Sequence, residues 1–454
     1  MTQISTFFGL QQSLRGLLAH QRAIDVTGHN ITNANTEGYS RQEAVMAAAT
    51  PYDIEAGLLV DGGGAMLGGG VDIQAFRRIR DGFLDLQYRA QSLRLGEYSG
   101  TASAMSQIEE GLSEPGENGI AAQLDKFWSS WSAVANAPEN LATRQNLVEQ
   151  AKVLAGAITD LDARITTIKA QVSAEYSSIT GPTGDIKSMA DEIAKLNAAI
   201  KFAVADGDQP NDLLDRRDVL LDQLSSYAQV SVTDLGNGAI SVNFGDAATP
   251  LVNDGTVTWP QTLTAPGGKL GALLQLTAPL VPVPPSTTPG TLESYRADLN
   301  AFAKKVADDV NALHNPGGTG TNFFTYGAAG TEAASLAVNV TATGVRYATG
   351  AATGANDIAI AIAKLRGSGA DQSYQSLVAR IGADVRNTLR LEDNAKVLTG
   401  AIDDRRQSTS GVSMDEEMSN LVRFQRGYQA SARAMSTIDE MLDVLINRAG
   451  RVGL

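Results

Sequence analysis

The stretch FFGLQQSLRGLLAHQRAIDVTGHNITNANTEGYS, residues 7–40, joins an amphipathic segment to a dense group of turn formers. Its apolar residues recur at steps of three, four and seven, which is typical of one face of a helix. They are Phe7, Leu10, Leu14, Leu17, Ile24 and Ile31. Asn33, Asn35 and Gly38 either bond their own backbone or tolerate positive φ, so the helix should end there. The chain then turns, and we expect Tyr39 to be exposed.

The other end of the chain has a matching pattern in MDEEMSNLVRFQRGYQASARAMSTIDEMLDVLINRAG, residues 414–450. Its seam residues step by three and four around Ser431: Leu421, Phe424, Tyr428, Met435, Ile438, Leu442 and Leu445. Ser413 and Glu416 fit a capping box at the helix start. An apolar stripe of this length needs another helix to cover it, and the N-terminal helix is the nearest match. The two ends should therefore meet, within one chain or between subunits.

Composition limits the classes of protein. The chain has 454 residues, enough for about three domains of roughly 150 residues each. Its 50 acidic and 36 basic residues give a net charge of −14, which argues against nucleic acid and anionic membranes as main partners. No apolar run reaches the ~18 residues of a membrane span, and the start lacks the pattern of a cleaved signal peptide. Zero cysteines and three scattered histidines exclude thiolate metal sites and histidine clusters.

Helical patterns dominate the first half of the middle part. Residues 81–110 are amphipathic, and Phe127, Trp128 and Trp131 of FWSSW stand at helical spacing, which favours a core position over a ligand box. The strongest periodicity follows at 147–172 and resumes at 186–200 after GPTG, residues 181–184. This pattern fits an antiparallel hairpin or, slightly better, one long helix with a kink.

The remaining segments alternate between strand-like and helical patterns. Residues 43–80 contain two glycine triplets and predict an extended loop with hairpin character, and 230–244 predict a hairpin around Asn237 and Gly238. Helices should return at 292–313 and from Tyr374, whereas 316–370 lack a strong pattern. The predicted domains are a terminal coiled coil, a helical bundle with a Gly-rich loop, and outer inserts that are β-rich or irregular. Their ranges are 1–45 with 406–454, then 46–228 with 291–315 and 371–405, and lastly 229–290 with 316–370.

Few residues suggest chemistry. The glycine triplets lack the Gly-Lys-Ser/Thr that follows a phosphate loop. Asp215 and Asp218 with Arg216 and Arg217 resemble an acid-base group, but on a helix they are more typical of a solvated face. No nucleophile, base and orienting residue occur together, so we predict no enzyme, cofactor or metal site. The fold class expected is mainly α with β-rich inserts.

At this point the residues resemble a known family. NITNANTEGYSRQ, residues 30–42, looks like the motif after the first helix of bacterial flagellar axial proteins, and residues 414–450 resemble their shared C-terminal helix. Long helices between 81 and 227, NDLLDRRDVLLDQL and SGVSMDEEMSNLVRFQ resemble the hook-associated members of that family. The chain looks short for the family, which suggests a reduced outer domain. The resemblance implies an assembly role for Asn33, Asn35, Gly38 and Tyr39.

The resemblance also implies a function and partners. It implies a structural subunit that polymerises as a tubular homo-oligomer at the hook-filament junction and adapts the hook to the flagellin filament. The implied partners are the hook protein, a second junction protein and a flagellar export chaperone at the C-terminal helix. The implied location is the extracellular flagellum, reached by type III export without a cleavable signal. Two alternatives stay open: a hook or rod subunit, unless residues 81–227 form a helical bundle, and a secreted coiled-coil adhesin or type III translocator.

Overall fold

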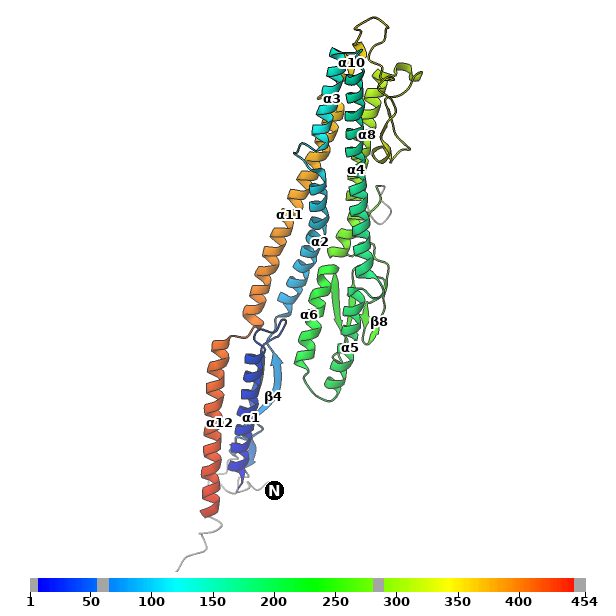
Figure 1. Cartoon of the computed structure of the whole chain (residues 1–454). Coiled ribbons are helices and arrows are strands. Elements are labelled where there is room, and N and C mark those ends of the chain that lie inside the picture. Colours follow the sequence, from blue (N-terminus) through cyan, green and yellow to red (C-terminus); the bar gives the residue numbers. More distant parts are fainter. Residues whose placement is uncertain (1–6, 55–64, 281–289, 445–454) are drawn as a thin grey trace, which may run out of the picture.

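The computed structural model describes residues 7–54, 65–280 and 290–444 of the chain. These residues form an elongated molecule that is mostly helical and carries small sheets (Figure 1). The two terminal helices lie at one end, and the long helices of the middle part extend away from them. The prediction of a mainly helical chain with small β parts is confirmed at this level.

The terminal helices are α1 (Phe8–Thr32) and α12 (Met414–Asp443). They lie side by side and antiparallel: Gly9 faces Ile438, Gly16 faces Ser431, and the His20 ring lies against Gly427. The terminal helices therefore meet within one chain, as the sequence predicted. α1 ends where the turn formers begin, because Thr36 N–H bonds Asn33 O and Tyr39 N–H bonds Thr36 O.

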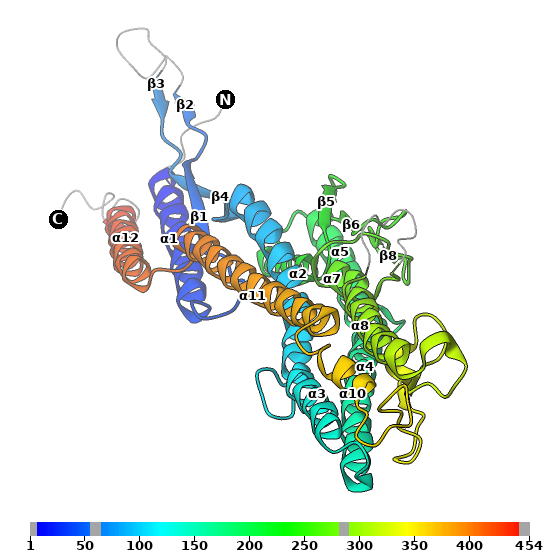
Figure 2. The ribbon, with the colours of Figure 1, turned by 90° about the horizontal axis from the view of Figure 1, so that it is seen from above.

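A two-stranded ribbon covers another side of α1 (Figure 2). It pairs β1 (Gln42–Ala48) with β4 (Val71–Arg78) in antiparallel register from Gln42–Arg78 to Ala48–Val71, with an irregularity between Val45 and Met46. Beyond it, β2 (Tyr52–Ile54) pairs with β3 (Ala65–Leu67). The hairpin character predicted for residues 43–80 is confirmed, and the first glycine triplet lies outside the described residues.

Long helices build the body of the molecule and bury one continuous apolar core. They are α2 (Gly82–Leu112), α3 (Ile120–Asn136), α4 (Leu141–Thr180), α5 (Asp185–Ala205), α6 (Asn211–Tyr227), α8 (Thr291–His314) and α11 (Gly369–Ser410). Phe127, Trp128 and Trp131 are fully buried in this core, where the Phe127 ring contacts Phe323 and Phe324 and the Trp131 ring contacts Phe323. The core position predicted for FWSSW is confirmed, and residues 81–227 form the successive helices α2 to α6, as the resemblance to hook-associated proteins implied.

The turn at 181–184 is a break between two helices. Gly184 N–H bonds Gly181 O, and α5 continues beyond the end of α4 without folding back along it (Figure 1). The kinked continuation is therefore the observed arrangement. α5 packs instead on α6 and on the edge of a small sheet.

Residues 229–290 were expected to be β-rich, and they contain both a sheet and a helix. The strands are β5 (Val230–Asp234), β6 (Ile240–Phe244), β7 (Val252–Asn253) and β8 (Thr256–Val257), in that order across the sheet. The predicted hairpin is confirmed, with Val230 opposite Phe244. The helix, α7 (Gly268–Thr277), was missed, and it buries Leu270, Leu273 and Leu276 against α2 and the main core.

Residues 316–370 are mostly irregular, as their lack of pattern indicated. Their short elements are η1 (Pro316–Gly318), β9 (Phe324–Thr325), α9 (Glu332–Ser335), β10 (Ala337–Val338) and α10 (Asp357–Ala363). Asn311 fixes the first part of the segment, because its side chain both accepts from Phe324 N–H and donates to Phe324 O.

Candidate assembly site

The α1 surface that faces α12 is made of small and polar residues. Gly9 and Gly16 approach α12 closely enough that an added Cβ would lie 3.1 and 3.0 Å from Ile438 and Ser431 atoms. The large residues predicted for this seam lie elsewhere: Leu14 is 44% exposed and Phe7 49%, whereas Leu10, Leu17, Ile24 and Ile31 are partly buried. The prediction that one leucine row faces the partner helix is therefore wrong for Leu14. Two glycines allow a closer approach of the helix axes than leucines would.

On α12 the predicted seam residues are those that the neighbouring helix partly covers. Leu421, Phe424, Tyr428, Met435, Ile438 and Leu442 are each half-buried. Leu445 lies outside the described residues. A second apolar row, formed by Met414, Met418 and Val422, is exposed. The pair of helices therefore covers one stripe of α12 and leaves another open.

The turn after α1 is fixed tightly to the helical body. Gly38 has a φ of 75°, and a Cβ there would lie 2.0 Å from Val219 Cγ2 on α6, so both its conformation and its contact need glycine. Ser40 N–H donates to the buried carboxylate of Asp215 at 2.9 Å. Asn33 and Thr36 bond each other across the turn, and Asn35 is exposed. The turn thus joins α1 to α6 within one chain.

Tyr39 is half-buried, which corrects the expectation of an exposed side chain. Its hydroxyl donates to Asn30 Oδ1 at 2.8 Å and lies 3.0 Å from His29 Nδ1. Burial, with the nearby charges of Asp212, Asp215 and Glu417, raises the pKa of the Tyr39 hydroxyl, so it stays protonated and can donate. The ring folds back on α1 because both polar partners stand on that helix.

Glu417 is the buried residue among the described positions of α12, with 2% of its side chain exposed. It accepts from Arg41 Nε at 2.7 Å and from Asn30 Nδ2 at 3.0 Å. Glu416 is bound by Arg41 Nη1 at 2.8 Å. The capping box predicted from Ser413 and Glu416 is therefore wrong: Ser413 makes no side-chain cap bond. A charged guanidinium is a stronger partner for Glu416 than the cap amide.

Three segments of the chain connect the terminal helices to the helical body. They lie side by side and are joined by backbone hydrogen bonds. Arg41 N–H donates to Ser410 O at 2.8 Å, and Ile79 N–H donates to Arg41 O at 2.8 Å. These hydrogen bonds fix the segments after α1, before α2 and after α11 relative to one another. Arg41 is the central residue of this joint, because its backbone ties the crossings and its side chain ties α12.

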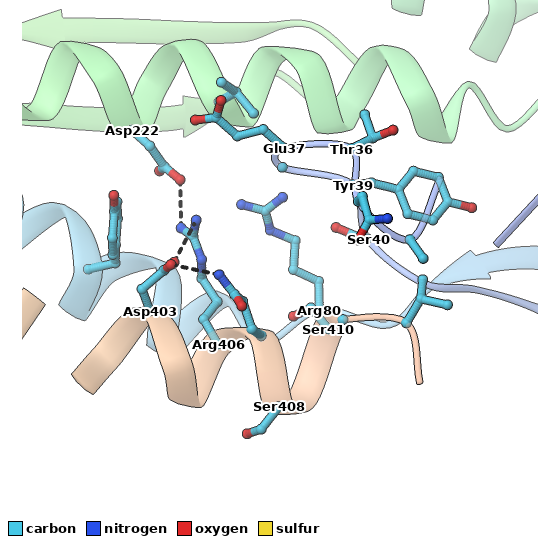
Figure 3. A pocket seen from close by; sticks show the side chains of 18 of the residues that line it. Thr36, Glu37, Tyr39, Ser40, Arg80, Asp222, Asp403, Arg406, Ser408 and Ser410 are labelled. Atoms are coloured by element: carbon cyan, nitrogen blue, oxygen red, sulfur yellow. Dashed lines mark hydrogen bonds and ion pairs between the residues drawn. The ribbon is translucent and has the colours of Figure 1, made fainter. Parts of the chain in front are cut away.

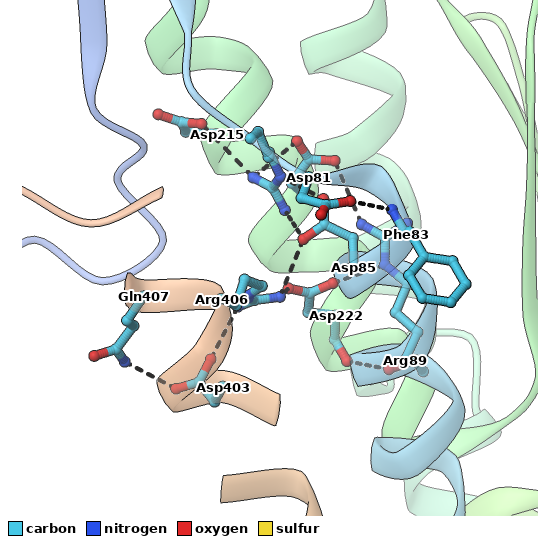
Figure 4. A network of polar contacts seen from close by, with 12 residues as sticks. Asp81, Phe83, Asp85, Arg89, Asp215, Asp222, Asp403, Arg406 and Gln407 are labelled. Carbon is cyan, nitrogen blue, oxygen red and sulfur yellow. Dashed lines mark hydrogen bonds and ion pairs between the residues drawn. The ribbon is translucent and has the colours of Figure 1, made fainter. Parts of the chain in front are cut away.

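A buried ionic cluster, shown in Figure 4, fixes the body side of the joint. Arg78 and Arg80 precede α2, Arg89 lies on α2 and Arg406 on α11, and they face carboxylates of α2, α6 and α11. The carboxylates are Asp85, Asp215, Asp218, Asp222 and Asp403. Asp222 bonds Arg89 Nε at 2.7 Å and Arg406 Nη1 at 2.6 Å, so it links three helices.

This cluster corrects the prediction of a solvated face on α6. Asp215 and Arg217 are buried, and Arg217 donates to Asn197 Oδ1 and Gly238 O; Arg216 instead binds Glu192 at the surface. Burial raises the pKa of Asp218, but Arg80, Arg78 and Arg89 outweigh it and hold that pKa below its usual range. Carboxylates paired in this way hold neighbouring elements together.

A cavity of about 580 Å³ lies beside the joint, as Figure 3 shows. Its lining combines the turn at Asn35–Ser40 with Arg80, Asp222, Asp403, Arg406 and the segment from Ser408 to Ser413. The arginines on its wall are already paired with aspartates. Over the described residues, no group of three His, Asp or Glu side chains is placed to hold a metal ion. No helix among the same residues has the length and apolar character that crossing a membrane requires.

The described residues define an elongated, mainly helical protein whose first and last helices pair at one end of the molecule. Three family models match the chain. One described as the flagellar hook-associated protein FlgK helical domain matches residues 105–265, and a flagella basal body rod protein model matches 10–39. One described as flagellar basal body rod FlgEFG protein C-terminal matches 405–448.

Relatives match over nearly the whole chain. Flagellar hook-associated protein 1 of Bacillus subtilis is 28% identical over 505 residues, covering 98% of this chain and 99% of the relative. The Escherichia coli protein of the same name is 24% identical over 565 residues, covering 96% and 99%. The solved flagellar hook junction protein FlgK from Burkholderia pseudomallei is 24% identical over 53% of this chain and 47% of that one, with a TM-score of 0.44.

The family models and the two full-length relatives confirm the resemblance to the flagellar axial proteins and, within them, to flagellar hook-associated protein 1. The chain is a structural protein of the bacterial flagellum. The alignments run over 505 and 565 positions and so exceed this chain's 454 residues, which means that the relatives contain segments that this chain lacks.

Proposed function

We propose that this chain polymerises as a tubular homo-oligomer at the junction between hook and filament and adapts one to the other. The single observation that carries the proposal is the exposure of large apolar residues on the paired terminal helices. After α1 and α12 have paired, both still expose large apolar residues, among them Leu14 and Leu18 on α1 and Met414, Met418 and Val422 on α12. Exposed apolar rows on a helix pair are typical of contacts with further copies. The names of the relatives give the hook-associated location.

The proposal assigns a role to each part of the chain. Residues 1–45 and 406–454 form the inner core of the tube, and the helical domain of 46–228, 291–315 and 371–405 surrounds it. Residues 229–290 and 316–370 face outward. The location of α1 and α12 at one end of the molecule, away from the helical body, supports this division (Figure 1).

The assembly residues proposed are the terminal stripes and the turn motif. They comprise Phe7, Leu10, Leu14, Leu17, Ile24, Ile31, Asn33, Asn35, Gly38, Tyr39, Leu421, Phe424, Tyr428, Met435, Ile438, Leu442 and Leu445. The contacts described above divide them into two roles. Gly38 and Tyr39 hold α1 against the body of their own chain, and so they orient the pair for assembly. The partly covered α12 residues hold the pair together.

The partners proposed are the hook protein, a second junction protein and an export chaperone that holds α12 before assembly. The apolar rows support a chaperone, because α12 separated from α1 would expose both of its rows. Export through the flagellar type III apparatus and an extracellular flagellar location complete the proposal, together with a role that involves no catalysis.

The test replaces the chain in the bacterium that makes it with Ile438→Asp. Ile438 Cδ1 lies 3.1 Å from the position of a Cβ on Gly9, so the carboxylate would fall between α1 and α12. We expect hooks without filaments, flagellin released into the medium and no swimming. The matched control is Thr437→Asp, one residue round the helix and exposed, which should swim. Normal filaments on cells that lack the chain altogether would overturn the proposed function.

A further inference from the structure

The exposed apolar residues of the terminal helices form two short rows. Met414, Met418 and Val422 follow one another at steps of four on α12 and are 47%, 49% and 44% exposed. Leu14 and Leu18 have the same step on α1 and similar exposure. Residues four apart stand above one another on a helix, so each row is a continuous strip.

The α1 row and the Val422 end of the α12 row point away from the partner helix within the chain, whereas Met414 and Met418 stand on the flank of α12 beside the buried Glu417. Leu14 and Leu18 each stand two residues from Gly16, which faces α12, and two residues correspond to about 200° round a helix. Val422 likewise stands two residues before Phe424, whose ring lies against His20 of α1. The α1 row therefore lies on the outer side of the helix pair, and the α12 row runs from the flank to the outer side of α12.

The rows also lie at different heights. The facing pairs Gly9–Ile438, Gly16–Ser431 and His20–Gly427 place Met418 level with His29, whereas the α1 row is centred on Gly16. The difference is about 13 residues, or about 20 Å at 1.5 Å per residue. One chain cannot bring its own rows together, but two parallel copies shifted by this distance can.

We infer that α1 of one copy packs on α12 of the next, with Leu14 and Leu18 against the row of Met414, Met418 and Val422 and a shift of about 20 Å along the helices. This inference rests on the proposed function, polymerisation through the terminal helices. The contact joins two different surfaces, so it leaves one free row on each outer copy and propagates. The same axial shift at every lateral contact gives a helical arrangement of subunits.

Charge supports the same register. Asp415 lies three residues before Met418, and Arg22 lies four residues after Leu18; both are exposed. Because α12 runs antiparallel to α1, both charges fall at the same end of the proposed contact. The carboxylate of one copy then meets the guanidinium of the next, and other shifts along the helices lose this match.

Disulfide formation between copies tests the register directly, because the sequence contains no cysteine. Leu18→Cys and Met418→Cys are introduced into separate copies that are produced together in the flagellated bacterium, and purified flagella are oxidised. A bond requires Cα atoms within about 7 Å, which only the proposed contact provides. The control pairs Leu18→Cys with Met441→Cys, an equally exposed methionine near the other end of α12. We expect a covalent dimer with Met418→Cys and none with Met441→Cys.

The inference is overturned if flagella of normal appearance give a covalent dimer with both cysteine pairs, or with the Leu18→Cys and Met441→Cys pair alone. Either result leaves the proposed function standing. If either cysteine in the rows prevents assembly, Arg22→Cys and Asp415→Cys test the same contact outside them. Absence of a dimer from that pair in assembled flagella also overturns the inference. Absence of the wild-type chain from purified flagella is a different result, and it overturns the proposed function itself.

Discussion

Arg41 and Glu417 stand 376 positions apart in the sequence, yet the Arg41 Nε–H bonds the buried Glu417 carboxylate at 2.7 Å. The same guanidinium binds Glu416, and the Arg41 backbone joins the segments that end at Ser410 and Ile79. One residue thus connects α12, the turn after α1 and the start of α2. The orientation of the terminal pair relative to the helical body depends on this joint.

Glu417→Gln should loosen α12 more than Glu416→Gln does. Glu417 is 2% exposed, so its neutralisation leaves Arg41 without its buried counter-charge at a cost of about 2–4 kcal/mol. Glu416 is 61% exposed, and its pair with Arg41 contributes at most about 1 kcal/mol. Hydrogen exchange of α12 amides in the isolated subunit measures the difference. Equal exchange in the two variants would show that the buried pair does not hold the helix.

Gly38→Ala should destabilise the joint, whereas Gly28→Ala should not. Alanine at 38 meets both a φ of 75° and the Val219 side chain, so we expect a loss of about 2 kcal/mol or more. Gly28 is inside α1 with open space around it, and alanine there should add up to about 1 kcal/mol of stability. Thermal melting of both variants checks the pair. A Gly38→Ala protein that melts like wild type would contradict the close fit of the turn on α6.

Buried His314 should make the helical body less stable in mild acid. Burial lowers the pKa of His314 from 6.5 to about 4, and its ring lies between Thr321 O and Arg346 N–H. Between pH 6.5 and about 4 the unfolded chain binds a proton at this histidine and the folded chain does not, so stability falls as pH falls. Above pH 6.5 the histidine adds no pH dependence.

Melting temperatures of wild type and His314→Gln across this range provide the measurement. Glutamine keeps a donor and an acceptor but does not titrate, so its curve should be flatter between pH 6.5 and 4. Below pH 4 the two curves should fall together, because carboxylates such as Asp218, whose pKa is held low by arginines, titrate in both. Parallel curves over the whole range would exclude His314 as the titrating group.

The sequence predicted the elements whose signals are local. The end of α1, the β5–β6 hairpin with its turn at Asn237 and Gly238, and the break after Thr180 all follow from residues next to them. α7 carried such a signal in Leu270, Leu273 and Leu276, which stand three apart, but its glycines and the surrounding prolines obscured it.

The joint could not be predicted in the same way, because its partners are distant in the sequence. A glutamate near a helix start is ordinarily exposed, and nothing near Glu417 indicates that Asn30 and Arg41 will bury it. Asp215, Asp218 and Asp222 likewise meet arginines of β4, α2 and α11. The α12-facing side of α1 did carry a signal, because Gly9, Gly16, Ala23 and Asn30 recur every seven residues. The large apolar residues, however, recur on another face and give the stronger helical pattern.

Gly427→Ala tests whether the close approach of α1 and α12 is what holds the terminal pair. A Cβ on Gly427 would lie 2.6 Å from two ring atoms of His20, so the ring or the helix must move. We expect α12 to separate more readily from α1, at about 1–3 kcal/mol, and swimming to be impaired. Adding His20→Ala removes the ring, so the methyl group introduced at position 427 has space. The double variant should therefore regain both the pairing of α12 with α1 and normal swimming. Limited proteolysis of α12 and swimming assays measure the two effects. If Gly427→Ala is defective and His20→Ala does not relieve the defect, the two sites do not interact energetically, and the defect does not arise from a clash between the new methyl group and the His20 ring.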